Sequence, residues 1–202
     1  MPWGMQSPGS TAALILAGGK ASRMGGGDKP LLDVGGSSML VRVIAALRPE
    51  ATAVAISANG DPARFAAFGL PVVADGAFEG EGPLAGLLAG LDWAATLHAT
   101  ALLTVPGDTP LVPSGLATAL APPPACAVTG DHVHHLVALW PVACRDDLRR
   151  LLAAPGRRNV EHFARLVGMR RVDFPLAKWD GFVNVNTPDD LALARSIAER
   201  GI

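Results

Sequence analysis

A glycine-rich segment with two fixed positive charges follows an apolar run near the start of the chain. The run 12–16 is continuously apolar and predicts a buried strand. Five glycines lie within 18–27, so backbone N–H groups of this segment can approach a ligand closely. Arg23 and Lys29 stand in the same segment, and Lys20 is a third candidate cation. Backbone donors and cations at the end of a strand favour an oligophosphate ligand; the alternative is a glycine-rich turn with solvated basic residues.

The loop matches neither of the common phosphate-binding motifs. It contains no G-x-x-x-x-G-K-[ST] sequence, which excludes a Walker A loop. Its first two glycines, Gly18 and Gly19, are adjacent, which excludes the dinucleotide fingerprint G-x-G-x-x-G. The sequence therefore predicts a third kind of phosphate loop, longer than these two and with cations built into it.

An aspartate follows a second continuously apolar run. The run 101–105 predicts a buried strand, and Asp108 comes shortly after it, between Gly107 and Thr109. Ligands of open α/β sheets bind outside the carboxyl ends of the strands, so we expect Asp108 and the glycine-rich loop at one rim. A carboxylate facing a triphosphate needs a bridging cation, and Mg²⁺ is typically held by one or two carboxylates with phosphate oxygens and waters. We therefore predict Mg²⁺ at Asp108; the alternative is an Asx-turn residue before Pro110.

Two further places near strand ends carry polar side chains. Asn184 and Asn186 point to the same face if the backbone between them is extended, and two amides there could orient a substrate or complete the outer shell of a metal. Asp75 closes the apolar run 71–74 and could reach the same rim. The alternative in each case is a residue that forms a turn at the end of a strand.

The histidines and cysteines do not predict a metal centre. His132 and His134 could share a strand face, but no third ligand stands at a telling spacing, which favours loop or surface histidines. Cys126 and Cys144 form no C-x-x-C pair, and two cysteines are too few for a disulfide scaffold. We interpret both cysteines as small buried apolar residues. Sequence spacing predicts no Ser/His/Asp or Cys/His set for covalent catalysis.

The composition is that of a globular protein with a substantial core. The 202 residues are 50% hydrophobic and 17% charged, and they fit one domain, 1–202, with 1–10 flexible. The net charge of −1, without a basic block, argues against a nucleic-acid partner. No secretory leader is evident, and no apolar run approaches the roughly 20 residues of a membrane span. We therefore expect a cytoplasmic protein that does not bind membranes.

Apolar runs alternate with helical patterns, which predicts a mostly parallel α/β sheet. The expected strands are 12–17, 53–57, 71–74, 101–105, 125–129, 134–142, 169–173 and 181–185. The expected helices are 38–48, 62–68, 83–97, 113–121, 145–153, 159–166 and 188–199. The segment 125–182 is less regular and is compatible with an inserted antiparallel pair.

Several short motifs together resemble the molybdenum cofactor guanylyltransferase family of the nucleoside-triphosphate transferase superfamily. The resemblance extends from Leu14 to Ala194. It rests on Leu16-Ala17-Gly18-Gly19, Ser22-Arg23-Met24-Gly25, Asp28-Lys29-Pro30-Leu31-Leu32, Gly82-Pro83-Leu84-Ala85-Gly86, Pro106-Gly107-Asp108-Thr109-Pro110 and Phe182-Val183-Asn184-Val185-Asn186-Thr187-Pro188. The first motif is common to many nucleotidyltransferases, whereas the Asp28-Lys29, Gly82–Gly86 and Asn184–Pro188 motifs together indicate the guanylyltransferase.

The resemblance implies a doubly wound, Rossmann-like fold of the nucleotide-diphospho-sugar transferase type, with helices on both faces of the sheet. It implies transfer of GMP from GTP to molybdenum–molybdopterin with release of pyrophosphate, assisted by Mg²⁺ at Asp108. Arg23, Lys29 and Asp108 would then be catalytic. The substrate contacts that it implies fall on Leu16, Ala17, Gly18, Gly19, Lys29, Ser57, Asp75, Gly82, Pro83, Asp108, Asn184 and Asn186. The resemblance is also compatible with transient contacts to proteins that deliver the pterin or accept the product.

The sequence departs from the family pattern at two places. Ser57 stands where the family often has an asparagine that helps to bind the nucleotide, with Asn59 two residues later. His134-His135 stands where the family tends to have His-Pro. The alternatives left open are a sibling enzyme that uses CTP, a nucleotidyltransferase with a sugar-phosphate acceptor, and a regulatory protein that binds a nucleotide without turnover.

Overall fold

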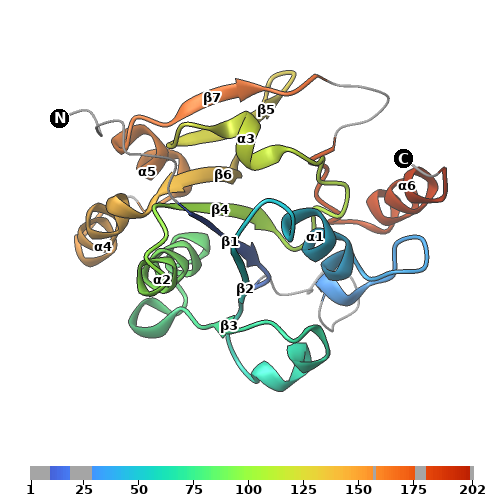
Figure 1. Ribbon diagram of the computed structural model, residues 1–202, viewed down its shortest axis with the longest axis horizontal. Helices are drawn as coiled ribbons and strands as arrows, with labels where there is room; N and C mark the ends of the chain where they lie inside the picture. Colours follow the sequence, from blue (N-terminus) through green and yellow to red (C-terminus); the bar gives the residue numbers. More distant parts are fainter. Residues whose placement is uncertain (1–9, 19–28, 157, 176–180, 201–202) are drawn as a thin grey trace.

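The computed structural model describes residues 10–18, 29–156, 158–175 and 181–200. Within these residues a seven-stranded sheet runs in the order β3-β2-β1-β4-β6-β5-β7 (Figure 1). The strands are β1 (Thr11–Leu16), β2 (Ala53–Ser57), β3 (Val72–Val73), β4 (Ala101–Pro106), β5 (Ala125–Thr129), β6 (His132–Pro141) and β7 (Arg170–Asp173). All neighbouring pairs are parallel except those of β6, which is antiparallel to both β4 and β5. The expected antiparallel insertion in 125–182 is therefore confirmed.

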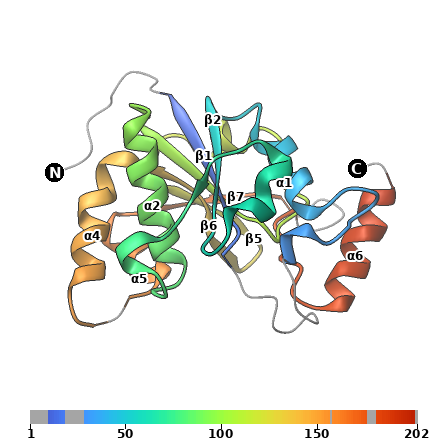
Figure 2. The same cartoon turned by 90° about the horizontal axis from the view of Figure 1, so that it is seen from below.

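Helices cover both faces of the sheet, as the doubly wound α/β prediction requires. They are α1 (Met39–Leu47), α2 (Pro83–Thr96), α3 (Leu116–Leu120), α4 (Arg145–Ala153), α5 (Val160–Leu166) and α6 (Pro188–Glu199). In Figure 2, α2, α4 and α5 lie on one side of the sheet and α1 and α6 on the other. None of the helices in the described residues is long and apolar enough to cross a membrane.

The central strand β1 is apolar from Ala12 to Leu16 because both of its faces are covered. Along β1, Ala13 and Ile15 belong to the core cluster under α1 and α3, whereas Ala12 and Leu14 belong to the cluster under α2, α4 and α5. Successive side chains of a strand point to opposite faces, so a strand between two helical layers needs apolar residues at every position. This accounts for the continuous run from which β1 was predicted.

Helix α2 packs closely on the strands because it carries glycine at two contact positions. A Cβ atom at Gly90 would lie 2.3 Å from Cδ2 of Leu14 on β1, and one at Gly86 would lie 2.5 Å from Oγ of Ser57 on β2. Any larger residue would push the helix away from the sheet. The close approach brings the N-terminal turn of α2 to the ends of β1 and β2.

The structure corrects two of the predicted elements. The segment 181–185, expected as a strand, is a turn followed by irregular chain. It lies beside the loop that follows β4 and not beside a strand, and one backbone hydrogen bond joins it to that loop, from Val185 N to Asp108 O at 2.9 Å. The segment Pro62–Phe68 is a 3₁₀ helix rather than an α-helix. The other predicted elements are present with ends shifted by a few residues, and the expected helix 113–121 shortens to α3.

Candidate functional site

The site candidates lie at the edge of the sheet where the parallel strands end. β1 pairs with β2 on one side and with β4 on the other, so the strand order reverses between β1 and β4. Such a reversal opens a crevice outside the carboxyl ends of the two strands, which is where ligands bind in open α/β sheets. Two backbone bonds join the strand ends here: Gly107 N donates to Leu16 O at 2.9 Å, and Ala17 N donates to Ser57 O at 2.9 Å.

A lysine and an aspartate meet directly at this rim. Lys29 Nζ donates a hydrogen bond to Asp108 Oδ2 at 2.6 Å, and the two side chains are 11% and 24% exposed. Lys29 starts a short 3₁₀ helix (η1, Lys29–Leu31). Pro30 of this helix packs under Gly107, so that a side chain at position 107 would press against the proline ring. This packing holds η1 against the end of β4. The cation of one predicted motif therefore lies on the carboxylate of another, 79 positions away.

The segment 184–186 lies against the same turn. Lys29 Nζ donates a second hydrogen bond to Asn186 Oδ1 at 2.7 Å. Asn184 Oδ1 accepts from the fully buried hydroxyl of Thr109 at 2.7 Å. We name 184–186 the strap, because it is bound to the Asp108–Thr109 turn through both backbone and side chains. Thr109 is a contact that the sequence reasoning missed; its only signal was its position next to Asp108.

The strap is anchored at its other end by the start of α6. Asp190 Oδ2 accepts the backbone N–H groups of Asn186 at 2.9 Å and Thr187 at 2.8 Å, and Thr187 Oγ1 accepts from Asp190 N at 3.2 Å. This reciprocal arrangement is a capping box, as Thr187-Pro188 at the helix start favours. The hydrogen bond from the backbone of Asn186 is the main reason that the pKa of Asp190 lies below its ordinary value.

A second group of predicted residues gathers at the ends of β1, β2 and β3. A Cβ atom at Gly86 would lie 2.5 Å from Ser57 Oγ, 3.3 Å from Leu16 Cδ2 and 3.4 Å from Asp75 Oδ1. Gly82 is the N-cap of α2 and Pro83 its first residue, so the Gly82–Gly86 motif opens the helix that faces these strand ends. Gly86 was part of the sequence motif but was not predicted as a contact.

Asn59 holds the carboxylate of Asp75 in place. Its Nδ2 donates to Asp75 Oδ2 at 2.8 Å, and its Oδ1 accepts from Asp75 N at 2.9 Å. Ser57 at the end of β2 is buried, with 3% of its surface exposed, and its Oγ points towards α2. Ser57 departs from the family pattern, and Asn59, two residues later, is the asparagine near the end of β2 that contacts Asp75.

Several predicted residues lie outside the described part of the chain. These are Gly19 and Arg23, together with the third candidate cation Lys20. Ala17 and Gly18 are described and lie directly after β1 at the rim. Among the described residues, the two groups stay separate: Asp75 contacts Asn59, whereas Lys29 and Asp108 contact each other and the strap.

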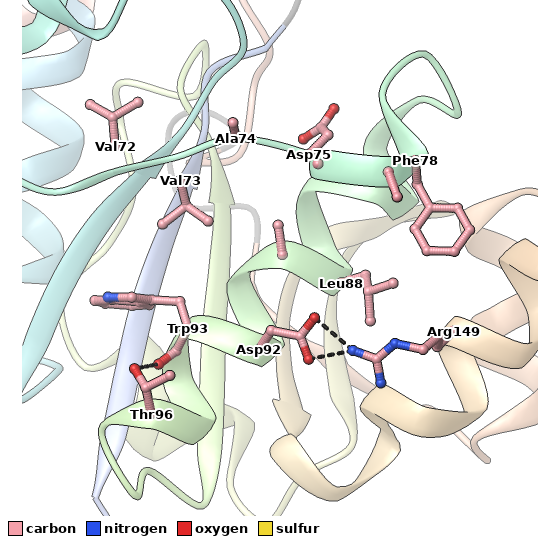
Figure 3. Close-up of a pocket in the computed structure, with 13 residues that line it drawn as sticks. Val72, Val73, Ala74, Asp75, Phe78, Leu88, Asp92, Trp93, Thr96 and Arg149 are labelled. Carbon is pink, nitrogen blue, oxygen red and sulfur yellow. Dashed lines mark hydrogen bonds and ion pairs between the residues drawn. The ribbon is translucent and has the colours of Figure 1, made fainter.

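A cavity of about 600 Å³ lies between β3, the 3₁₀ turn η3 (Gly76–Phe78) and the outer side of α2 (Figure 3). An ion pair lies in its lining, with Arg149 Nη2 bound to both carboxylate oxygens of Asp92 at 2.6 and 2.7 Å. Figure 3 shows the carboxylate of Asp75 pointing away from this pair. The cavity therefore adjoins the Asp75 group, and Lys29 and Asp108 do not line it.

The histidines differ from the predicted loop or surface positions, whereas the cysteines are buried as expected. His132, His134 and His135 lie on strand β6. His134 is buried, and one of its ring nitrogens lies 2.6 Å from Thr129 Oγ1, while its ring packs edge-on against His132. In the part of the chain that the structure describes, no three His, Cys, Asp or Glu residues are grouped to hold a metal ion. Cys126 and Cys144 are buried free thiols, and burial raises the pKa of Cys144 to about 12.

Comparison with known proteins identifies the family. The family model described as the MobA-like NTP transferase domain matches residues 13–168. The chain belongs to the MobA-like NTP transferase family. A molybdenum cofactor guanylyltransferase of Acidiphilium cryptum is 51% identical over 184 residues, which cover 91% of this chain and 93% of that protein. Another, from Rhodopseudomonas palustris, is 46% identical over 200 residues and covers 95% of both chains.

Solved structures of MobA-like and other nucleotidyltransferases share this fold. Molybdopterin-guanine dinucleotide biosynthesis protein A from Archaeoglobus fulgidus superposes with a TM-score of 0.69 at 22% identity, covering 94% of this chain and 99% of that one. CMP:2-keto-3-deoxy-manno-octonic acid synthetase, complexed with CTP, superposes with a TM-score of 0.65 at 16% identity, covering 97% and 100%. The fold is therefore the nucleotide-diphospho-sugar transferase type that the resemblance implied. The MobA-like family is one of nucleotidyltransferases, so the chain is an enzyme of this class.

Proposed function

We propose that this protein transfers GMP from GTP to molybdenum–molybdopterin, releasing pyrophosphate and forming the guanine dinucleotide form of the cofactor. Relatives that match more than nine-tenths of the chain are named molybdenum cofactor guanylyltransferases. The observation in this chain that carries the proposal is the contact of Lys29 with Asp108 at the switch point of the sheet. It puts a cation and a hard oxygen ligand together where a triphosphate would bind.

The reaction needs positioning and charge neutralisation more than proton transfer. An oxygen of the terminal phosphate of the pterin attacks the α-phosphorus of GTP, and the bond from that phosphorus to the β-phosphate oxygen breaks. Pyrophosphate leaves with the bonding electron pair. The attacking phosphate is already an anion at neutral pH, so no general base is required. What the protein supplies is an in-line arrangement and positive charge near the leaving group.

Lys29 and Arg23 are proposed to stabilise the negative charge that develops on pyrophosphate. Lys29 Nζ is held at 2.6 Å from Asp108, so its ammonium is already at the rim before a nucleotide arrives. A cation that is placed in advance stabilises the developing charge without reorganising during the reaction.

The Asp108 carboxylate fits a Mg²⁺ ion. Mg²⁺ prefers oxygen ligands and binds through one or two protein carboxylates together with phosphate oxygens and waters. Lys29 contacts Oδ2 of Asp108, so Oδ1 can face a second cation, and the side chain is 24% exposed. When bound, the ion would neutralise phosphate charge and let two anionic substrates approach.

The two halves of the rim are proposed to bind different substrates. Leu16, Ala17 and Gly18 on β1 and its loop, with Ser57, Asp75, Gly82 and Pro83, would contact the nucleotide, as would Gly19. Asn184 and Asn186 would lie next to the incoming pterin phosphate. Gly86 supports this division, because it lets Ser57, Leu16 and Asp75 converge beside α2. We place the reaction in the cytoplasm, where GTP is available.

Pyrophosphate release tests the proposal. The protein is mixed with molybdenum–molybdopterin and Mg²⁺, and release is measured with GTP, CTP, ATP and UTP in parallel. We expect release with GTP that stops when Mg²⁺ is chelated. Faster release with CTP would favour a cytidylyltransferase, and release with a sugar phosphate but not with the pterin would favour a different acceptor. Binding of GTP without release would favour a regulatory protein and contradict the proposal.

A further inference from the structure

The amide group of Asn186 has only one orientation that fits its contact with Lys29. The lysine ammonium can donate hydrogen bonds but cannot accept them. The atom of Asn186 that lies 2.7 Å from Lys29 Nζ is therefore the oxygen Oδ1, and the NH₂ group is turned away from the ammonium. The flipped amide would place its NH₂ group against the lysine ammonium, and two donors cannot hydrogen-bond to each other.

The backbone around Asn186 is fixed from both sides. Its own N–H is bound to Asp190 at the start of α6 at 2.9 Å. The preceding residue, Val185, is fully buried, and its N–H donates to the carbonyl of Asp108 at 2.9 Å. The backbone of Asn186 is therefore held beside the turn that carries Asp108, although Asn186 follows Lys29 by 157 positions in the sequence.

Asn186 and Asp108 act differently on the ammonium that they share. The carboxylate of Asp108 holds Lys29 but neutralises its charge. The amide oxygen of Asn186 holds the same ammonium and leaves its net charge unchanged. An ammonium has three N–H donors, and these two partners engage two of them. The third N–H would donate to a phosphate oxygen of the nucleotide.

We propose that Asn186 is a positioning residue for the phosphates of GTP and acts through Lys29, rather than a contact for the pterin alone. This inference rests on the proposed function and deepens it, because it moves one of the two strap asparagines to the nucleotide side of the reaction. The C-terminal helix α6 then takes part in the site through the link from Asp190 to Asn186 to Lys29.

A double-mutant cycle distinguishes the two roles of Asn186. The dissociation constant of GTP with Mg²⁺ is measured by calorimetry for the wild type, Asn186→Ala, Lys29→Ala and the double variant. Loss of a hydrogen bond to a charged group weakens binding by about tenfold or more, so we expect at least that loss for Asn186→Ala. In the Lys29→Ala background the same change should have no further effect, because residues in one network are not additive. An equal loss in both backgrounds, or a change confined to the KM of the pterin, would overturn the inference.

Selective acylation of lysine provides a readout that does not depend on turnover. The chain has three lysines, Lys20, Lys29 and Lys178, so the labelling of each can be followed by mass spectrometry and the other two serve as references. We expect acetic anhydride to label Lys29 several-fold faster in Asn186→Ala than in the wild type. Asn186→Asp keeps an acceptor oxygen and should keep Lys29 slow.

A matched control separates positioning from general loosening of the fold. Ser38→Ala removes the hydrogen bond that the Ser38 hydroxyl accepts from Val41 N at the start of α1, and it touches neither Lys29 nor Asp108. Its Lys29 labelling should equal that of the wild type. Unchanged labelling in Asn186→Ala would refute the positioning role whatever the activity. A labelling change in a protein that neither binds GTP nor releases pyrophosphate would refute the proposed function instead.

Discussion

The carboxylate of Asp108 accepts a hydrogen bond from Lys29 at 2.6 Å, and both side chains are less than one-quarter exposed. Partial burial strengthens the interaction of this carboxylate with cations compared with the same group in water. Asp108 has two candidate cations in the proposed reaction, Lys29 and Mg²⁺. Its negative charge, more than its shape, is therefore the property that the reaction needs.

Replacing Asp108 by asparagine should separate charge from shape. Asp108→Asn keeps an oxygen that Lys29 can bind but removes the charge that would hold Mg²⁺. We expect turnover to fall by about 10²–10³, by analogy with the loss of one preorganised electrostatic contact. Pyrophosphate release over a range of Mg²⁺ concentrations measures the effect.

The control for this variant removes the charge of another aspartate, one that is not part of the rim. Asp147 on α4 pairs with Arg150 one turn along the same helix. Asp147→Asn should keep normal turnover, and both variants should keep the melting temperature of the wild type within a few degrees. Near-normal turnover in Asp108→Asn would contradict the metal assignment.

Helix α2 has one glycine next to the predicted site residues and another next to the core, so that the same substitution can be compared at the two positions. Gly90 faces Leu14 and Leu102 in the core, and Gly86 faces Ser57, Leu16 and Asp75. Alanine has a better helix propensity than glycine by up to about 1 kcal/mol, whereas overpacking costs about 1–3 kcal/mol. The steric term is the larger one where a Cβ would come within 2.3–2.5 Å of another atom.

We expect Gly90→Ala to lower the melting temperature, with the KM for GTP unchanged, because its contacts are confined to the core. Gly86→Ala should raise the KM for GTP several-fold, because the new methyl group displaces Ser57 and the side chains around it. Thermal unfolding and initial-rate kinetics measured on both variants test this difference. If both raised the KM equally, the Gly86 corner would have no particular part in nucleotide binding.

The capping box of α6 predicts a pH dependence of stability. The pKa of Asp190 is lowered in the folded state, chiefly by the hydrogen bond from Asn186 N, so the unfolded chain takes up this proton at a higher pH than the folded chain. The ionised carboxylate therefore stabilises the fold above the ordinary value of 3.8, and this contribution is lost as the pH falls through the lowered pKa.

Urea unfolding of the wild type and Asp190→Asn between pH 3 and pH 6 tests this sign. The wild type should be the more stable of the two at pH 5–6, and the difference should shrink as the pH falls below about 4. A difference that stayed constant across the range would mean that the charge of Asp190 does not contribute. The same variant loosens the strap, so its effect on Lys29 labelling should resemble that of Asn186→Ala in direction.

At the scale of the whole molecule, one sheet carries both groups of residues at the rim. β1 supplies residues to the core clusters on both faces, and β4 hydrogen-bonds to β1 on one side and to β6 on the other. In the described residues all seven strands are joined by hydrogen bonds into this one sheet. We therefore expect the single domain that the composition indicates to unfold in one cooperative transition.

The two buried thiols provide probes of this transition. Burial raises the pKa of Cys126, and that of Cys144 to about 12, so folding lowers the reactivity of both thiols. We expect both to react with a thiol reagent only as fast as the chain unfolds, with urea midpoints equal to the one from circular dichroism. Reaction of Cys144 before the loss of helical signal would reveal a separate unit containing α4.

The sequence predicted a strand correctly where both faces of the strand are buried, and a helix correctly where the residues before it are typical of a helix start. β1 and β4 were predicted from apolar runs, and the sequence Thr187-Pro188-Asp189-Asp190 is typical of the helix start that α6 shows. The segment 181–185 shows the limit of this reasoning, because the apolar residues Phe182, Val183 and Val185 are as compatible with a strand as with a buried irregular segment. Hydrogen-bonding partners decide between these, and the partner of Val185 is a loop residue 77 positions earlier, Asp108.

The sequence by itself predicted the residues of the proposed chemistry: cations in a glycine-rich loop, an aspartate after a buried strand, and two asparagines before a helix. These depend on residue type and local position, which a sequence displays. Only the tertiary structure decided that Lys29 lies between Asp108 and Asn186, and that Asn59 holds Asp75. Contacts of this kind join segments that meet only when the sheet forms, and an ammonium or amide binds whichever partner the packing brings within about 3 Å.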